Sequence, residues 1–239
     1  MINRLTSSKS ADPDMTPPFQ KIQLIEVSVF LCLILPAIAL SLLEVEQRNL
    51  TFPIVATVTI VHNLTLLSLV LFFIWRNGES FQSLGLTFPN SGREIAIGVG
   101  LFFPFVFGIS LFETLLHKLG FVLPDSPPRY LIPSGNAQYL LALAFLVVVA
   151  VSEEAIFRGY LMLRFHAVTG SAWVAGLLSS TIFAFGHGYQ GSGGVLTVGL
   201  MGLLLALVYL WRGSLVAPIT MHFLQNFIGI ILIPLQKAT

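Results

Sequence analysis

The sequence is poor in charge and has a single cysteine. Only 10% of its 239 residues are charged, against about 25% in typical soluble domains. With a formal net charge of +1, it has neither a basic stripe for nucleic acid nor a polybasic juxtamembrane cluster. The lone Cys32 excludes an internal disulfide. The sequence is instead rich in hydrophobic residues, which make up 55% of the chain and give a mean hydropathy of +0.87.

Apolar runs long enough to cross a bilayer, about 17 to 25 residues each, recur along most of the chain. The sequence therefore predicts an all-α fold, a polytopic transmembrane helix bundle of about seven spans, within a range of six to eight. A polar N-terminal tail (residues 1–21) would precede a single transmembrane domain (residues 22–239). The predicted spans are Ile22–Leu43, Ile54–Trp75, Ile95–Leu116, Tyr139–Phe165, Ala172–His187, Val195–Trp211 and Leu215–Leu235.

The basic residues outside these spans indicate an orientation. Seven lie on the side of the N-terminus and four on the other side, which predicts a cytoplasmic N-terminus. The first group comprises Arg4, Lys9, Lys21, Arg76, Arg93, Arg164 and Arg212, and the second comprises Arg48, Lys118, Arg129 and Lys237.

The segment SEEAIFRG, residues 152–159, places two carboxylates and a guanidinium inside one of the most apolar spans. A charged side chain at the centre of a spanning helix costs roughly 2.5–3.5 kcal/mol, so these groups should face the bundle interior. Glu154 and Arg158 are four residues apart, close enough on one helix face to form a salt bridge. Glu153 is rotated about 100° from Glu154 and has no such partner. It is therefore available as a general base.

Two more polar side chains lie in apolar spans with a partner four residues away. His187 shares a helix face with Phe183, and His222 shares one with Asn226. Counted from the turn at residues 169–171, Glu153 and His187 are each about 17 residues, or roughly 25 Å, into the membrane. His222 is only about 8 residues, or roughly 12 Å, from the turn at residues 212–214, so its depth agrees loosely.

A carboxylate, two imidazoles and an amide suit the activation of a water molecule and the stabilisation of an oxyanion. The sequence contains no G-x-S-x-G, no H-E-x-x-H and no Glu-x-x-His at these positions, which argues against a serine hydrolase elbow, a zincin and a di-iron bundle. The positions of Glu153, His187 and His222 are still compatible with a zinc site.

Three motifs carry a resemblance to a known family. They are E-E-x-x-x-R at Glu153, Glu154 and Arg158, F-x-x-x-H at Phe183 and His187, and H-x-x-x-N at His222 and Asn226. In this order on three apolar segments, over about residues 138–230, they resemble the CPBP (CAAX protease and bacteriocin-processing) family of intramembrane proteases, which includes the Ras-converting type CAAX prenyl proteases.

The resemblance implies a role for each of these residues. Glu153 would activate the attacking water with help from His187, and His222 with Asn226 would stabilise the oxyanion. Glu154 and Arg158 would hold the helix in place as structural support of the site. The implied reaction is metal-independent hydrolysis of a peptide bond in or near the membrane. The expected partners are a membrane-associated peptide or protein substrate and the lipid bilayer, with no nucleic acid.

A non-enzymatic alternative uses the same buried polar residues. They also suit a membrane scaffold, an immunity protein or a proton-linked transporter. Nothing in these residues identifies a prenylated substrate. Glu26, in the first span, is interpreted as an interhelical contact.

Overall fold

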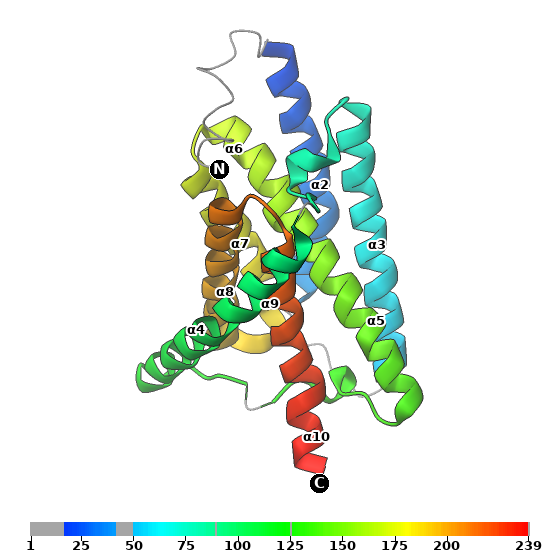
Figure 1. Ribbon diagram of the computed structural model, residues 1–239, viewed down its shortest axis with the longest axis vertical. Coiled ribbons are helices and arrows are strands. Elements are labelled where there is room, and N and C mark those ends of the chain that lie inside the picture. The colour runs from blue at the N-terminus through cyan, green and yellow to red at the C-terminus, as the bar shows by residue number, and fades with distance from the viewer. Residues whose placement is uncertain (1–16, 42–49, 89, 125, 239) are drawn as a thin grey trace.

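The computed structural model describes residues 17–41, 50–88, 90–124 and 126–238. Within these ranges the secondary structure is helical, with no β-strand. Figure 1 shows the long helices packed side by side around an oblique central segment formed by α5 and α6. The predicted all-α bundle is confirmed.

The helices follow the predicted order of spans. They are α2 (Pro17–Ser41), α3 (Phe52–Arg76), α4 (Ser91–Lys118), α5 (Asn136–Glu153), α6 (Met162–Thr169), α7 (Ala172–Phe185), α8 (Gly191–Arg212), α9 (Val216–Phe227) and α10 (Ile233–Ala238). Short 3-10 turns lie between some of them: η1 (Phe81–Leu84), η2 (Arg129–Leu131) and η4 (Gly188–Gln190). Two π-helical segments, η3 (Glu154–Leu161) and η5 (Ile228–Leu232), join α5 to α6 and α9 to α10.

Six segments of the described chain are long and apolar enough to cross a bilayer, so the protein is an integral, multi-pass membrane protein. They are Lys21–Ala39, Phe52–Arg76, Ser91–Lys118, Asn136–Thr169, Gly188–Arg212 and Val216–Gln236. The seventh predicted span is the shorter helix α7, which has 14 residues and ends at Phe185. At about 21 Å it is shorter than the hydrocarbon core. Of the predicted polar tail, residues 1–16 lie outside the described residues.

The central element is the continuous segment Asn136–Thr169, formed by α5, η3 and α6. Its 34 residues exceed the ~20 that a perpendicular span needs, and it runs obliquely through the bundle (Figure 1). Half of its most apolar window is buried, against 17% of the window in α3. The segment buries Leu146 against Phe52 of α3 at one end, and Ile156 against Phe30 of α2 further along.

The connection between α3 and α4 folds back onto the bundle. Leu84 is fully buried, and its carbonyl oxygen lies so close to Gly159 that a Cβ there would be 2.9 Å away. The next residue, Gly85, adopts a φ of +80°, and its carbonyl oxygen accepts a hydrogen bond of 3.0 Å from the N–H of Leu215. The chain that leads into α9 is therefore anchored beneath this connection.

A buried ion cluster joins α2, the end of α3 and α6. Arg164 Nη1 is 2.8 Å from Glu79 Oε1, and its Nη2 is 3.8 Å from Glu26 Oε2. Asn77 Nδ2 donates a 2.9 Å hydrogen bond to the same Glu26 oxygen. The interhelical contact predicted for Glu26 is present in the fold.

Candidate functional site

The two adjacent glutamates lie where α-helix gives way to π-helix. α5 ends at Glu153, and Glu154 begins η3. A π-helix widens the turn and changes the hydrogen-bond pattern of its carbonyls, and such segments are frequent at functional sites. Here the Ser179 hydroxyl of α7 donates a 2.6 Å hydrogen bond to the Phe157 carbonyl of η3. Sequence periodicity predicts only a continuous α-helix at this point and gave no signal for the change.

The buried pair of Glu154 and Arg158 forms as the spacing predicts. Arg158 Nη1 donates a 2.9 Å hydrogen bond to Glu154 Oε1, and the two side chains are 1% and 0% exposed. Arg158 Nη2 donates to the Gly202 carbonyl of α8 at 3.3 Å. The guanidinium carbon also lies 4.4 Å from the centroid of the Phe183 ring. Arg158 thus links η3 to α7 and α8.

Gly202 makes this arrangement possible because it has no side chain. A Cβ at this position would lie 3.2 Å from Phe183 Cδ1 and 3.3 Å from both Arg158 Nη2 and Ser180 Cβ. These contacts are tighter than an ordinary van der Waals separation. The close approach of α8 to the guanidinium therefore depends on glycine, a requirement that the sequence pattern did not reveal.

His222 lies against both glutamates. Its Nδ1 is 2.8 Å from Glu154 Oε1, and its Nε2 is 3.7 Å from Glu153 Oε2. The same Glu154 oxygen accepts a hydrogen bond from Arg158, so this oxygen is an acceptor and His222 Nδ1 is placed to donate to it. Helix spacing assigns Glu154 to Arg158 alone. The second contact joins residues 68 positions apart and was not found from the sequence.

Two features bring His222 to the level of the glutamates despite its shorter distance from a turn. The oblique course of Asn136–Thr169 makes the depth of Glu153 smaller than its residue count indicates (Figure 1). The start of α9 is also below the surface, because Leu215 is fully buried and the Ser214 hydroxyl donates to the Thr87 carbonyl at 3.4 Å. The loose agreement in depth found by counting residues has this physical cause.

His187 lies just beyond α7, between Gly186 and η4. Its Nδ1 is 2.9 Å from the Phe183 carbonyl oxygen, which can only accept, so Nδ1 carries the hydrogen. In the neutral ring Nε2 is then free to accept a proton. The Phe183 ring lies between the two histidines, 4.7 Å from the His187 ring and 6.0 Å from the His222 ring. Glu153 and His222 are close enough for their charges to act on His187.

Glu153 and Asn226 each have polar atoms that form no hydrogen bond within the described chain. The Glu153 side chain is 17% exposed, and its Oε2 forms no hydrogen bond within the described chain. Asn226 is half-buried in α9, and its amide forms no hydrogen bond to any residue that the structure describes. The site therefore combines a fixed carboxylate, Glu154, with a carboxylate and an amide that are available to a bound molecule.

The zinc alternative does not fit the arrangement of these side chains. Across residues 17–41, 50–88, 90–124 and 126–238, no group of three or more His, Cys, Asp or Glu side chains is placed so that it could hold a metal ion. Glu153, His187 and His222 are near one another without forming such a group.

Residues 135–228 match the family model described as Rce1-like, type II CAAX prenyl endopeptidase Rce1-like. The chain contains an Rce1-like domain. This domain extends from the start of α5 to the end of α9 and includes every candidate site residue, so the resemblance seen in the three motifs is confirmed. An Rce1-like domain implies a peptidase with a CAAX protease-like function in the membrane. No curated protein and no solved structure matches the chain.

Proposed function

We propose that the protein is an intramembrane endopeptidase in which Glu153, helped by His187, activates a water molecule for attack on a peptide carbonyl. The observation that carries the proposal is the meeting of three chain segments at one buried point. His222 of α9 lies 2.8 Å from Glu154 and 3.7 Å from Glu153, and Phe183 of α7 brings the His187 ring to the same place.

The uncommitted oxygen of Glu153 supports its role as the base. The carboxylate takes a proton from water while the water oxygen bonds to the carbonyl carbon, which forms a tetrahedral oxyanion. His187 Nε2, free to accept, orients the same water. When the C–N bond breaks, the proton held by Glu153 passes to the leaving amine. The carboxylate is then restored for the next cycle.

The proposed oxyanion donors are His222 and Asn226. Since His222 Nδ1 already donates to Glu154, a hydrogen bond to the oxyanion has to come from Nε2. His222 therefore acts as an imidazolium, and the carboxylates of Glu154 and Glu153 beside it stabilise that charge. Asn226 donates from its amide without any change of protonation.

The proposed substrate is a membrane-associated peptide or protein. Glu153 lies about halfway along the 34-residue central segment, so the scissile bond has to enter the membrane layer to reach it. The scissile carbonyl would approach from the side of Glu153, because Glu154 is sealed from solvent and held by two donors.

The decisive experiment uses the full chain in nanodiscs with a panel of membrane-anchored reporter peptides. Glu153→Gln keeps the size of the side chain and removes the base, so kcat should fall by about 10²–10⁴ while the melting temperature is retained. Glu113→Gln, in the membrane-spanning part of α4, is the matched control and should cleave like wild type. Full cleavage by Glu153→Gln would reject the mechanism. A cellular function retained in a cleavage-dead Glu153→Gln protein would favour the scaffold.

We also propose that the N-terminal side is cytoplasmic. The basic residues favour that side seven to four, and α2 begins at the end of the bundle opposite α10 (Figure 1). Alkaline phosphatase fused after residue 239 should then be active, because the fusion would be extracytoplasmic. An inactive phosphatase fusion, together with a fluorescent fusion protein that matures at the same position, would show that the C-terminus is cytoplasmic and would contradict the proposed orientation.

A further inference from the structure

A cavity of about 280 Å³ lies away from the candidate site, among η1, α6, the start of α7 and the end of α8. None of the candidate catalytic or supporting residues lines it. Its volume is close to the lower end of the range of small-ligand pockets, roughly 300–1,000 Å³. Apolar walls come from residues such as Met162, Ala175 and Leu210, and polar groups come from Ser83, His166 and Tyr209.

The polar groups of this cavity are uncommitted. His166 Nδ1 is a buried atom with no hydrogen-bond partner in the described chain. The hydroxyls of Ser83 and Tyr209 likewise make no hydrogen bond to a described residue. Buried polar atoms are normally satisfied, so the buried His166 Nδ1 indicates a ligand that supplies a hydrogen-bonding atom, and the hydroxyls of Ser83 and Tyr209 offer further hydrogen bonds beside it. No Asp, Glu, Lys or Arg side chain lines the cavity, which favours uncharged polar groups on that ligand.

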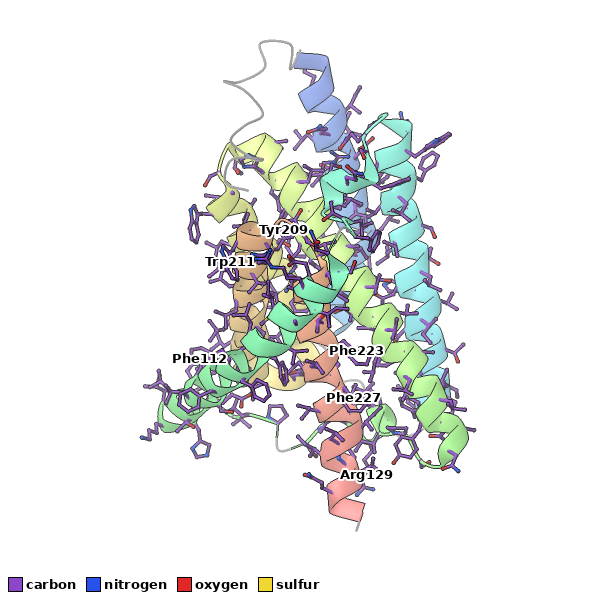
Figure 2. The ribbon with its side chains drawn as sticks, viewed as in Figure 1. Phe112, Arg129, Tyr209, Trp211, Phe223 and Phe227 are labelled. Carbon is purple, nitrogen blue, oxygen red and sulfur yellow. The ribbon has the colours of Figure 1, made fainter. Side chains whose placement is uncertain are left out.

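Two exposed tryptophans place the cavity at the membrane–water interface. Trp173 and Trp211 are 66% and 61% exposed and are adjacent in sequence to the lining residues Ala172 and Leu210. Figure 2 shows Tyr209 and Trp211 close together, near the point where α8 leads into α9. Exposed tryptophan is enriched at the level of the lipid headgroups. Lipids carry their ester and glycerol groups at this level, with acyl chains beneath.

We propose that this cavity binds a neutral membrane glycerolipid. The ester and hydroxyl groups of the lipid bond to Ser83, His166 and Tyr209, and the first part of an acyl chain lies against Met162 and Leu210. The bound lipid touches η1, which packs on Gly159 of η3, and the end of α8, which leads to the helix of His222. Lipid binding therefore stabilises the packing around the candidate site from a distance.

The test is photo-crosslinking of the full chain in phosphatidylcholine nanodiscs with a diacylglycerol that carries a diazirine near its ester. Labelling should concentrate on residues 162–166 and 209–210, and unlabelled diacylglycerol should compete with it. Ala172→Phe fills the cavity and should reduce this labelling at least tenfold. Ala167→Phe, half-buried on α6 and not part of the lining, is the matched control and should label like wild type.

A second variant keeps the test independent of any packing defect in Ala172→Phe. Tyr209→Phe removes one hydroxyl without filling the cavity and should lower the apparent affinity for diacylglycerol about fivefold. Equal labelling of wild type and both cavity variants would overturn the proposal. So would labelling of the cavity no stronger than that of Phe103 and Phe107, which are exposed on α4. Labelling of the cavity by a phosphatidylcholine with the same diazirine, as strong as that by the diacylglycerol probe, would overturn the neutral-lipid assignment.

Discussion

Two buried arginines, six residues apart on the same oblique segment, make a natural comparison. Arg158 and Arg164 are each 1% exposed, and each forms an ion pair with glutamate. Each guanidinium also lies near an aromatic ring, 4.4 Å from the centroid of Phe183 and 5.0 Å from that of Tyr160. By burial, charge and ring contact the two are nearly equivalent.

The difference lies in what surrounds each ion pair. Arg164 binds Glu26 of α2 and Glu79 after α3, so it ties separate parts of the bundle together. Arg158 binds a glutamate of its own segment, and that glutamate also holds His222. A buried ion pair in a membrane protein is therefore no sign of chemistry by itself. What indicates chemistry near Arg158 is the second carboxylate, Glu153, which has an oxygen without a hydrogen-bond partner in the described chain and lies beside imidazole rings.

The largest expected effect is that of Arg158→Ala. It leaves the fully buried Glu154 without its cation, and breaking one partner of a buried pair costs about 3–5 kcal/mol. We expect a large loss of folded protein in thermal unfolding, together with a lower cleavage rate of the fraction that folds. Arg158→Lys should restore part of the stability, since lysine cannot reproduce the contacts to Glu154 and Gly202 at once. If Arg158→Ala melted at the wild-type temperature, the Glu154–Arg158 pair would not be needed for the stability of the site.

Asn226→Ala should come next. If its amide stabilises charge only in the transition state, kcat should fall by about 10²–10³, with KM and melting temperature unchanged. Steady-state kinetics on a membrane-anchored peptide measure both constants. Gln225→Ala, the neighbouring amide on the same helix, is the matched control. A rise in KM with constant kcat would assign Asn226 to substrate binding instead.

Arg164→Ala tests whether the second buried arginine has a purely structural role. We expect a loss of about 1–3 kcal/mol of unfolding free energy, because Glu26 becomes unpaired in the interior while Glu79 is 18% exposed and can be hydrated. The cleavage rate per folded molecule should not change. If Arg164→Ala lowered kcat as strongly as Arg158→Ala, the two arginines would have to be assigned the same role.

Ser179→Ala should have the smallest effect. It removes the 2.6 Å hydrogen bond to the Phe157 carbonyl, for a loss of about 1 kcal/mol of unfolding free energy. A modest fall in melting temperature with a small change in kcat is the expected result. Ser180→Ala is a control from the next position of α7, because the Ser180 hydroxyl has no hydrogen-bond partner in the described residues. Equal destabilisation by both variants would show that Ser179 does not support the π-helix.

The sequence alone predicted the helical spans and the approximate positions of the polar side chains along them. It could do so because hydropathy and four-residue spacing are local properties. The Glu154–Arg158 pair belongs to this class. The contact of His222 with Glu154 does not, since it depends on the course of the central segment and on the anchoring of Leu215. The π-helix also went unnoticed, because a single widened turn barely changes the pattern of apolar residues. The roles of Glu153, His187, His222 and Asn226 stay predictions.

Because of the folded-back connection between α3 and α4, the Rce1-like domain cannot be separated from the chain before it without loss of a contact. It belongs to the chain before residue 135, yet Gly85 and Thr87 accept the hydrogen bonds that fix Leu215 and Ser214. An Rce1-like domain cut out as residues 135–228, or grafted onto other helices, would lose the anchor that sets the level of His222. The boundary of family similarity is therefore not a boundary of folding. Transplanting this site to another protein requires the segment around Gly85 to travel with it.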